Sequence, residues 1–152
     1  MAELKLPTFD AKILIEDRKR KILDPLRRKY VALTPEEWVR QHFVNYLISH
    51  KGYPVGLLAN EMAIALNGTT KRCDTVLFDR NGHPLMIIEY KAPSIKITKK
   101  VFDQIARYNI VLKVKYLIVS NGNEHYCCKV DYQANKCIFL QGIPDYSMLY
   151  TL

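Results

Sequence analysis

The 152-residue sequence predicts a single α/β domain with a central mixed sheet covered by helices on both faces. Short apolar segments with a period of two residues alternate with longer segments of helical periodicity. Two strands in the middle of the chain, at about residues 72–78 and 85–90, are apolar on both faces. Such strands are typical of a sheet that is covered on both sides. The expected order is a helix, three antiparallel strands, a helix, a strand and a peripheral strand pair.

The first 33 residues are expected to form an N-terminal arm before a core at about residues 34–142, within one domain spanning residues 1–152. The arm contains two basic clusters, at residues 18–21 and 27–29. Its apolar residues are enough for a short strand or two. The basic clusters fit either contacts to phosphates or solvated loop charges.

A helix over about residues 36–50 is predicted by the residues that flank it. Thr34 is expected to be the N-cap, with Pro35 as the first helical residue and Glu37 completing a capping box. Gly52 predicts the end of the helix. Apolar residues near helical spacing are expected to form its buried stripe: Trp38, Phe43, Leu47 and Ile48.

After a strand at about residues 61–66, a β-hairpin is predicted over residues 71–91, KRCDTVLFDRNGHPLMIIEYK. Asn81-Gly82 between alternating strands favours a two-residue type I′ turn, because both central residues of that turn need positive φ. This turn gives four cross-strand pairs: Arg80 and His83, Phe78 and Leu85, Val76 and Ile87, and Asp74 and Glu89. Lys91 lies two residues beyond Glu89 and therefore on the same face.

The C-terminal part is expected to contain a second helix over about residues 99–113, capped by Thr98 or a near neighbour. Strands are expected at about residues 116–120, 125–130 and 137–141. Four residues of the helix recur at helical spacing and predict a stripe that faces the core: Val101, Ile105, Tyr108 and Leu112.

The net charge of +8 and a pI near 9.3 predict an anionic partner, most simply nucleic acid, although a basic surface that maintains solubility fits equally well. The four cysteines show no CxxC spacing, which argues against a zinc site. Reduced thiols, the lack of a hydrophobic signal core and the lack of a long apolar run lead us to expect a cytoplasmic protein without a membrane partner.

The paired carboxylates predict a chemistry for the hairpin. Directly opposite residues in a hydrogen-bonded antiparallel pair have Cα atoms about 5.5 Å apart, so Asp74 and Glu89 repel each other. Either one carboxylate takes up a proton, or a cation such as Mg²⁺ lies between them. With the positive charge of Lys91 beside them, they suit metal-assisted hydrolysis of a phosphodiester. A surface salt-bridge cluster explains these three residues about equally well.

The order of these residues resembles the signature of the PD-(D/E)xK nuclease superfamily. Asp74 precedes Glu89-Tyr90-Lys91, although Cys73 replaces the proline of the family name. Gln104 and Tyr108 match the Gln-x-x-x-Tyr motif of one branch, which includes the N-terminal nuclease domain of type I restriction enzyme R subunits. The stretch at residues 35–41, with Gly-Tyr-Pro at 52–54, resembles the opening of that domain.

The resemblance implies a restriction-endonuclease-like core and a set of site residues. Asp74 and Glu89 would bind Mg²⁺ or Mn²⁺ together with the backbone carbonyl of Tyr90, and Lys91 would complete the catalytic set. Gln104 and Tyr108 would support the site or contact DNA. An additional acid from the first helix is assigned to Glu37, with Glu61 as the second choice.

The expected function is that of a magnesium-dependent DNA endonuclease domain of the type I restriction R-subunit type. Its partners would be DNA and, as candidates, a helicase motor, a methyltransferase or a specificity subunit. Two alternatives stay open at this point. One is a catalytically silent nuclease-fold module that binds DNA or docks a motor or modification subunit, and the other is a nuclease that acts on RNA.

Overall fold

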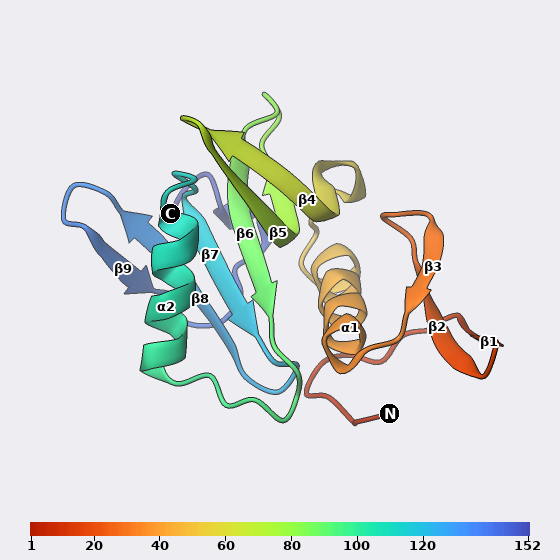
Figure 1. Ribbon diagram of the computed structural model, residues 1–152. Coiled ribbons are helices and arrows are strands. Elements are labelled where there is room, and N and C mark those ends of the chain that lie inside the picture. Colours follow the sequence, from red (N-terminus) through yellow and green to blue (C-terminus); the bar gives the residue numbers. More distant parts are fainter.

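The computed structural model describes residues 1–152 and contains a six-stranded and a three-stranded sheet with two α-helices (Figure 1). The larger sheet has the strand order β4-β5-β6-β7-β8-β9. Only β6 and β7 are parallel, so the sheet is mixed, as predicted. Its strands are β4 (Leu58–Leu66), β5 (Thr69–Phe78), β6 (Pro84–Tyr90), β7 (Tyr116–Ser120), β8 (His125–Asp131) and β9 (Lys136–Phe139).

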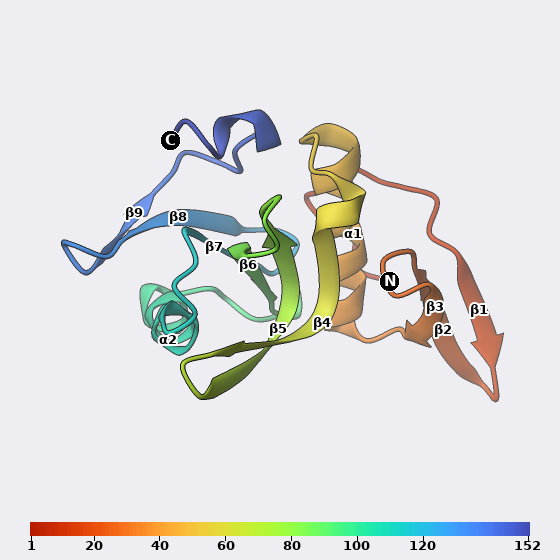
Figure 2. The ribbon, with the colours of Figure 1, turned by 90° about the horizontal axis from the view of Figure 1, so that it is seen from above.

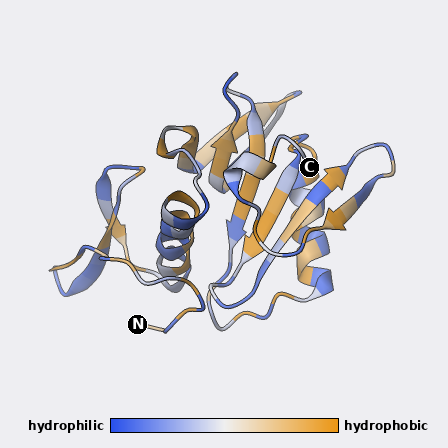
Figure 3. Ribbon diagram, turned by 180° about the vertical axis from the view of Figure 1, so that it is seen from behind, coloured by the Kyte–Doolittle hydropathy of each residue, from blue (hydrophilic) through white to orange (hydrophobic).

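The two helices, α1 (Pro35–His50) and α2 (Lys99–Ile110), belong to separate apolar cores on the two faces of this sheet. Neighbouring residues of β6 enter different cores, because Ile88 packs with α1 and Ile87 packs with α2. Figure 2 shows α2 on one side of the sheet and the C-terminal segment on the other, and Figure 3 shows the hydrophobic residues concentrated in its strands. The predicted α/β architecture with both faces covered is confirmed, and it is consistent with a restriction-endonuclease-like fold.

The N-terminal arm contains more structure than predicted. Three antiparallel strands, β1 (Ile13–Glu16), β2 (Lys19–Asp24) and β3 (Lys29–Ala32), form a separate sheet beside α1, on the side away from the large sheet (Figure 1). The first basic cluster belongs mostly to β2, because Asp17 and Arg18 make a two-residue turn with φ of 51° and 64°. Ile22 of β2 is fully buried and anchors the sheet.

Helix α1 begins and ends where the sequence predicts. Thr34 is the N-cap, since its Oγ1 accepts a hydrogen bond from the Glu37 N–H at 3.0 Å, and Pro35 is the first helical residue. Beyond the other end, Gly52 has a φ of 73°, a conformation that costs little only for glycine.

The buried stripe of α1 is rotated from the predicted one. Phe43 and Leu47 are fully buried, as predicted, but Trp38 and Ile48 are only half-buried. Val39 and Val44 are buried in their place, because α1 is covered by the N-terminal sheet as well as by the large sheet.

The register of the β5–β6 hairpin is confirmed in its central part. Val76 pairs with Ile87, as predicted, and Leu77 pairs with Met86. The register then shifts between Leu77 and Phe78, so that Phe78 pairs with Pro84 and not with Leu85. Leu85 therefore joins the core of α1.

The predicted type I′ turn at Asn81-Gly82 is wrong. Only Gly82 has a positive φ, of 81°, and its N–H donates to the Asp79 carbonyl at 3.1 Å. The Asp79 N–H donates to the His83 carbonyl at 2.7 Å, which leaves three residues in the loop and takes Arg80 out of register with His83. The Asp79 carboxylate accepts from the backbone N–H groups of Asn81 and His83, a local bond that competes with the tighter turn.

Helix α2 is capped by Thr98, as predicted, but it ends at Ile110 and not near residue 113. Its buried face also differs from the predicted stripe. The exposed fraction of Tyr108 is 49%, whereas Phe102 and Asn109 are buried. The remaining segments keep the predicted order, with β4 beginning earlier and β9 ending earlier than expected. Neither helix has the length and apolarity needed to cross a lipid bilayer.

The turn geometry gives a test of the hairpin. We expect Gly82→Ala to lower the free energy of unfolding by about 1 kcal/mol, because alanine is disfavoured at positive φ. Asn81→Ala is the matched control and should change it by less than about 0.5 kcal/mol, since that position has negative φ and its side chain makes no hydrogen bond. Urea denaturation measures both. Equal losses would indicate that both residues need positive φ, as in a type I′ turn.

Candidate functional site

A cavity of about 330 Å³ lies between the carboxyl end of β6 and helix α2. Four of the predicted site residues meet here: Glu89 and Lys91 come from the end of β6, and Gln104 and Tyr108 come from α2. Gln104 and Tyr108 are both exposed and lie at the solvent side of the cavity. The other lining residues are Ile95, Val101, Ile105 and Asn109.

Asp74 lies next to Glu89, at the end of the β5–β6 ladder. The last ladder pair is Thr75 and Ile88, so Asp74 occupies the next position on β5. Its Oδ2 accepts a hydrogen bond from the Tyr90 N–H at 2.9 Å. The Asp74 carboxylate therefore accepts a hydrogen bond from the backbone of β6 just beyond the last paired residues. This bond places the carboxylate beside Glu89.

Burial raises the pKa of Glu89 to about 8, and Asp74 adds to this increase through its negative charge and a side-chain hydrogen bond. The Asn109 amide and the ammonium of Lys91 act in the opposite direction. Burial and the nearby Asp74 carboxylate therefore both favour the protonated form of Glu89. The predicted neighbourhood of Asp74, Glu89 and Lys91 is present in the structure.

Asn109 is a residue of this site that sequence reasoning missed. Only 1% of its surface is exposed, and its Nδ2 donates to Glu89 Oε1 at 3.4 Å and to the Ile105 carbonyl at 3.0 Å. Its Oδ1 has no partner. The predicted core stripe contained Tyr108 instead. The spacing of Phe102, Ile105 and Asn109 was the available signal, because a polar residue on an apolar helical stripe is often a functional one.

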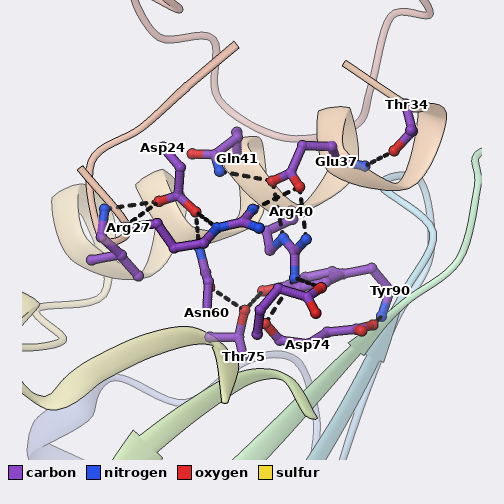
Figure 4. A network of polar contacts seen from close by, with 12 residues as sticks. Asp24, Arg27, Thr34, Glu37, Arg40, Gln41, Asn60, Asp74, Thr75 and Tyr90 are labelled. Carbon is purple, nitrogen blue, oxygen red and sulfur yellow. Dashed lines mark hydrogen bonds and ion pairs between the residues drawn. The ribbon is translucent and has the colours of Figure 1, made fainter. Parts of the chain in front are cut away.

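Glu37 does not lie in the cavity. It belongs to α1, on the other face of the sheet, where its two carboxylate oxygens are bound by arginine and amide groups (Figure 4). Arg40 donates to both oxygens, at 2.9 and 2.7 Å, while Arg27 and Gln41 donate at 2.7 and 2.9 Å. Its side chain is therefore committed to ion pairs and does not complete the predicted capping box.

Arg40 connects this network to Asp74. Its Nη1 donates to the Asp74 carbonyl at 2.9 Å and to Glu61 Oε1 at 2.8 Å. Glu61 stands opposite Asp74 on β4, but it has a φ of 55° and the two residues do not pair in the ladder. The guanidinium therefore satisfies the Asp74 carbonyl at the point where the sheet cannot.

A second chain of hydrogen bonds links the N-terminal sheet to Tyr90 (Figure 4). Asp24 of β2 accepts from Asn60 at 2.9 Å, and Asn60 accepts from the Thr75 hydroxyl at 2.7 Å. The Tyr90 hydroxyl donates to Thr75 at 2.9 Å. All four side chains are buried, so the residues on either side of Asp74 and Glu89 are held from beneath by a satisfied polar network.

The two neighbouring carboxylates fit magnesium. The carboxylates of Asp74 and Glu89 are oxygen ligands, and Mg²⁺ is commonly bound by one or two carboxylates while it keeps several waters. A cation between them would also favour the ionised form of Glu89, whose pKa is raised by burial and by the charge of Asp74. No group of three His, Cys, Asp or Glu side chains is placed to hold a metal ion by itself.

Comparisons with known proteins place this site in a family context. The chain matches the family described as type I restriction enzyme R protein N terminus over residues 35–144. A search of curated proteins finds no match.

Among solved structures, the chain is similar to a fragment assigned to an HsdR subunit of a type I restriction enzyme from Vibrio vulnificus YJ016. The TM-score is 0.56 at 19% identity, and the match covers 80% of this chain and 25% of that one. At this identity the likeness concerns the fold. The chain described here thus spans about a quarter of the length of that structure.

The ion pairs of Arg40 predict a large effect on stability. Arg40→Met would leave the Asp74 carbonyl without its side-chain donor and Glu37 with only Arg27 and Gln41 as partners, and we expect the free energy of unfolding to fall by about 3 kcal/mol. Arg72→Met is the control, because Arg72 also pairs with Glu61 but its side chain is 66% exposed. It should cost less than about 1 kcal/mol. Equal losses in urea denaturation would contradict a structural role for Arg40.

The raised pKa of Glu89 predicts how stability depends on pH. The folded chain holds this proton more tightly than the unfolded chain, in which the ordinary value is near 4.5. The contribution of Glu89 to the free energy of unfolding should therefore be full below about pH 4.5 and be lost as the pH rises to about 8. Glu89→Gln should remove this dependence.

The control for this measurement is Glu3→Gln, at an exposed position, which should keep the wild-type pH profile. Because the proton must leave before a cation can bind, Mn²⁺ affinity measured by calorimetry should increase over the same pH range. Parallel profiles for the wild type and Glu89→Gln would contradict the proton assignment.

Proposed function

The chain belongs to the family of type I restriction enzyme R protein N termini, and we propose that it is a magnesium-dependent DNA endonuclease domain of that type with a PD-(D/E)xK site. The observation that carries the proposal is the close approach of Asp74 to Glu89, which lines a cavity together with Lys91. Two carboxylates and one lysine at a cavity in a basic protein suit the hydrolysis of a phosphodiester.

Each residue has a proposed role that follows from its position. Asp74 and Glu89, with the backbone carbonyl of Tyr90, would hold the Mg²⁺, whose contribution is to make a bound water acidic. Lys91 would place its positive charge where negative charge grows on the phosphate. Gln104 and Tyr108, at the solvent side of the cavity, would position the DNA strand.

Contacts from α1, from the sheet and from α2 support this assignment of roles. Arg40 holds the backbone of Asp74 from the side of α1, and the Tyr90 N–H binds the Asp74 carboxylate within the sheet. Asn109 orients Glu89 from the side of α2. The carboxylates are therefore held in place before a substrate arrives, which is what electrostatic stabilisation of a transition state requires.

We further propose that DNA choice and movement come from other parts of a type I restriction system. The chain spans about a quarter of the similar HsdR fragment, and it shows no recognition helix of its own. A helicase motor, a methyltransferase or a specificity subunit are the candidate partners.

Plasmid hydrolysis in the presence of Mg²⁺ tests the proposal. We expect the wild type to nick supercoiled plasmid, and Glu89→Gln and Lys91→Met each to lower the rate by about 100-fold or more, since each removes a group that acts on the developing charge. Glu3→Gln and Lys136→Met are matched controls at exposed positions and should keep the wild-type rate.

Equal nicking by all five proteins would show that the cavity is not the active site. Mn²⁺ binding by the wild type without any nicking would favour the alternative of a silent module that binds DNA or docks a partner. Competition by RNA for the same cavity distinguishes the remaining alternative, an RNA-directed nuclease.

A further inference from the structure

Lys71 of β5 has its ammonium over the ring of Tyr108 of α2, with Nζ 3.7 Å from the ring centroid. No carboxylate lies within ion-pair distance of Lys71. Ordering a lysine side chain costs about 2 kcal/mol of rotamer freedom, of which a partly exposed cation–π contact recovers about 0.5 to 1 kcal/mol. The ring therefore offsets part of this cost and favours a position over Tyr108 for a positive charge that no carboxylate of the protein neutralises.

This oriented charge lies beside the candidate active site. Tyr108 lines the cavity that contains Glu89 and Lys91, and Lys71 precedes Asp74 by three residues on β5. Because half of the Tyr108 surface is exposed, a polymer that reaches the carboxylates from solvent would pass this side chain.

The chemistry of Lys71 indicates what it would bind. A lysine ammonium is a point charge that suits a phosphate oxygen. Contacts to backbone phosphates position a nucleic acid without reading its sequence, which agrees with a domain that has no base-reading element.

We propose that Lys71, held on the ring of Tyr108, binds a backbone phosphate of the substrate strand next to the phosphodiester at Asp74 and Glu89. This subsite rests on the proposed function for its location beside the reacting group. Lys71 is the binding residue, and Tyr108 is a positioning residue that acts through it.

The salt dependence of DNA binding tests the subsite. The affinity of the full chain for a fluorescent duplex oligonucleotide is measured by anisotropy in EDTA over a range of salt concentrations. Lys71→Met should lower the slope of log affinity against log salt by about one, the value for one lost phosphate contact. Lys136→Met removes the same charge from β9, at the other edge of the sheet, and should keep the wild-type slope.

The contact with Tyr108 has its own readouts. Lys71→Arg should keep the slope, since a guanidinium retains the charge and also packs on aromatic rings. Tyr108→Leu and Lys71→Met should weaken binding by less in combination than the product of their separate effects. Strictly multiplicative effects would overturn the positioning role, and an unchanged thermal midpoint in each variant shows that the fold is intact.

The outcomes separate this inference from the proposed function. A wild-type slope for Lys71→Met, in a protein whose nicking depends on Glu89, overturns the subsite and leaves the nuclease assignment standing. A lowered slope in a protein that does not nick DNA supports the phosphate contact and overturns the nuclease assignment. A wild-type chain that binds no oligonucleotide overturns both.

Discussion

The guanidinium of Arg40 is the contact on which the geometry of the candidate site depends. It bridges Glu37 of α1, Glu61 of β4 and the carbonyl of Asp74 of β5, at the one position where the β4–β5 ladder lacks a pair. A residue such as Glu61 with positive φ costs of order 1 to 3 kcal/mol and persists only when its surroundings hold it. Here the buried ion pairs supply that support, and Asp74 is fixed as a result.

The two faces of the sheet contribute differently to the site. The face toward α1 holds the polar network of Arg40, Glu37 and Thr75, which is buried and fully hydrogen-bonded. The face toward α2 carries Glu89, whose pKa is raised by burial and by the nearby Asp74 carboxylate. A rigid network with all its hydrogen bonds made therefore lies under a pair of carboxylates that repel each other. Functional sites commonly combine a stable surrounding structure with locally unfavourable interactions of this kind.

Local patterns predicted most of the fold and the proximity of Asp74, Glu89 and Lys91. The caps at Thr34 and Thr98 and the central register of the β5–β6 hairpin follow from interactions between residues close in sequence, so they were readable. The type I′ turn predicted at Asn81-Gly82 was wrong because the Asp79 carboxylate accepts hydrogen bonds from backbone N–H groups of the loop. The Asn-Gly pair by itself does not reveal this effect.

The misses in the site have a different cause, which is contact between distant segments. The buried face of α2 depends on where the crossover from β6 to β7 places the helix, and Asn109 could be recognised only once that rotation was known. The role of Glu37 depends on Arg27, which the N-terminal sheet brings to α1. The helical spacing of Asn109 with Phe102 and Ile105 was a weak signal by itself, and the pairing of Glu37 with Arg27 leaves no periodic signal in the sequence.

The exposure of Gln104 and Tyr108 has an evolutionary consequence. Residues that line the mouth of a cavity without supporting the core can change at little cost in folding free energy, whereas substitutions in the buried network under Asp74 lower the stability of the fold. The retention of Gln104 and Tyr108 in a shared motif therefore cannot be explained by a demand of the fold. Selection on these two side chains would act through what enters the cavity, independently of selection for a stable domain.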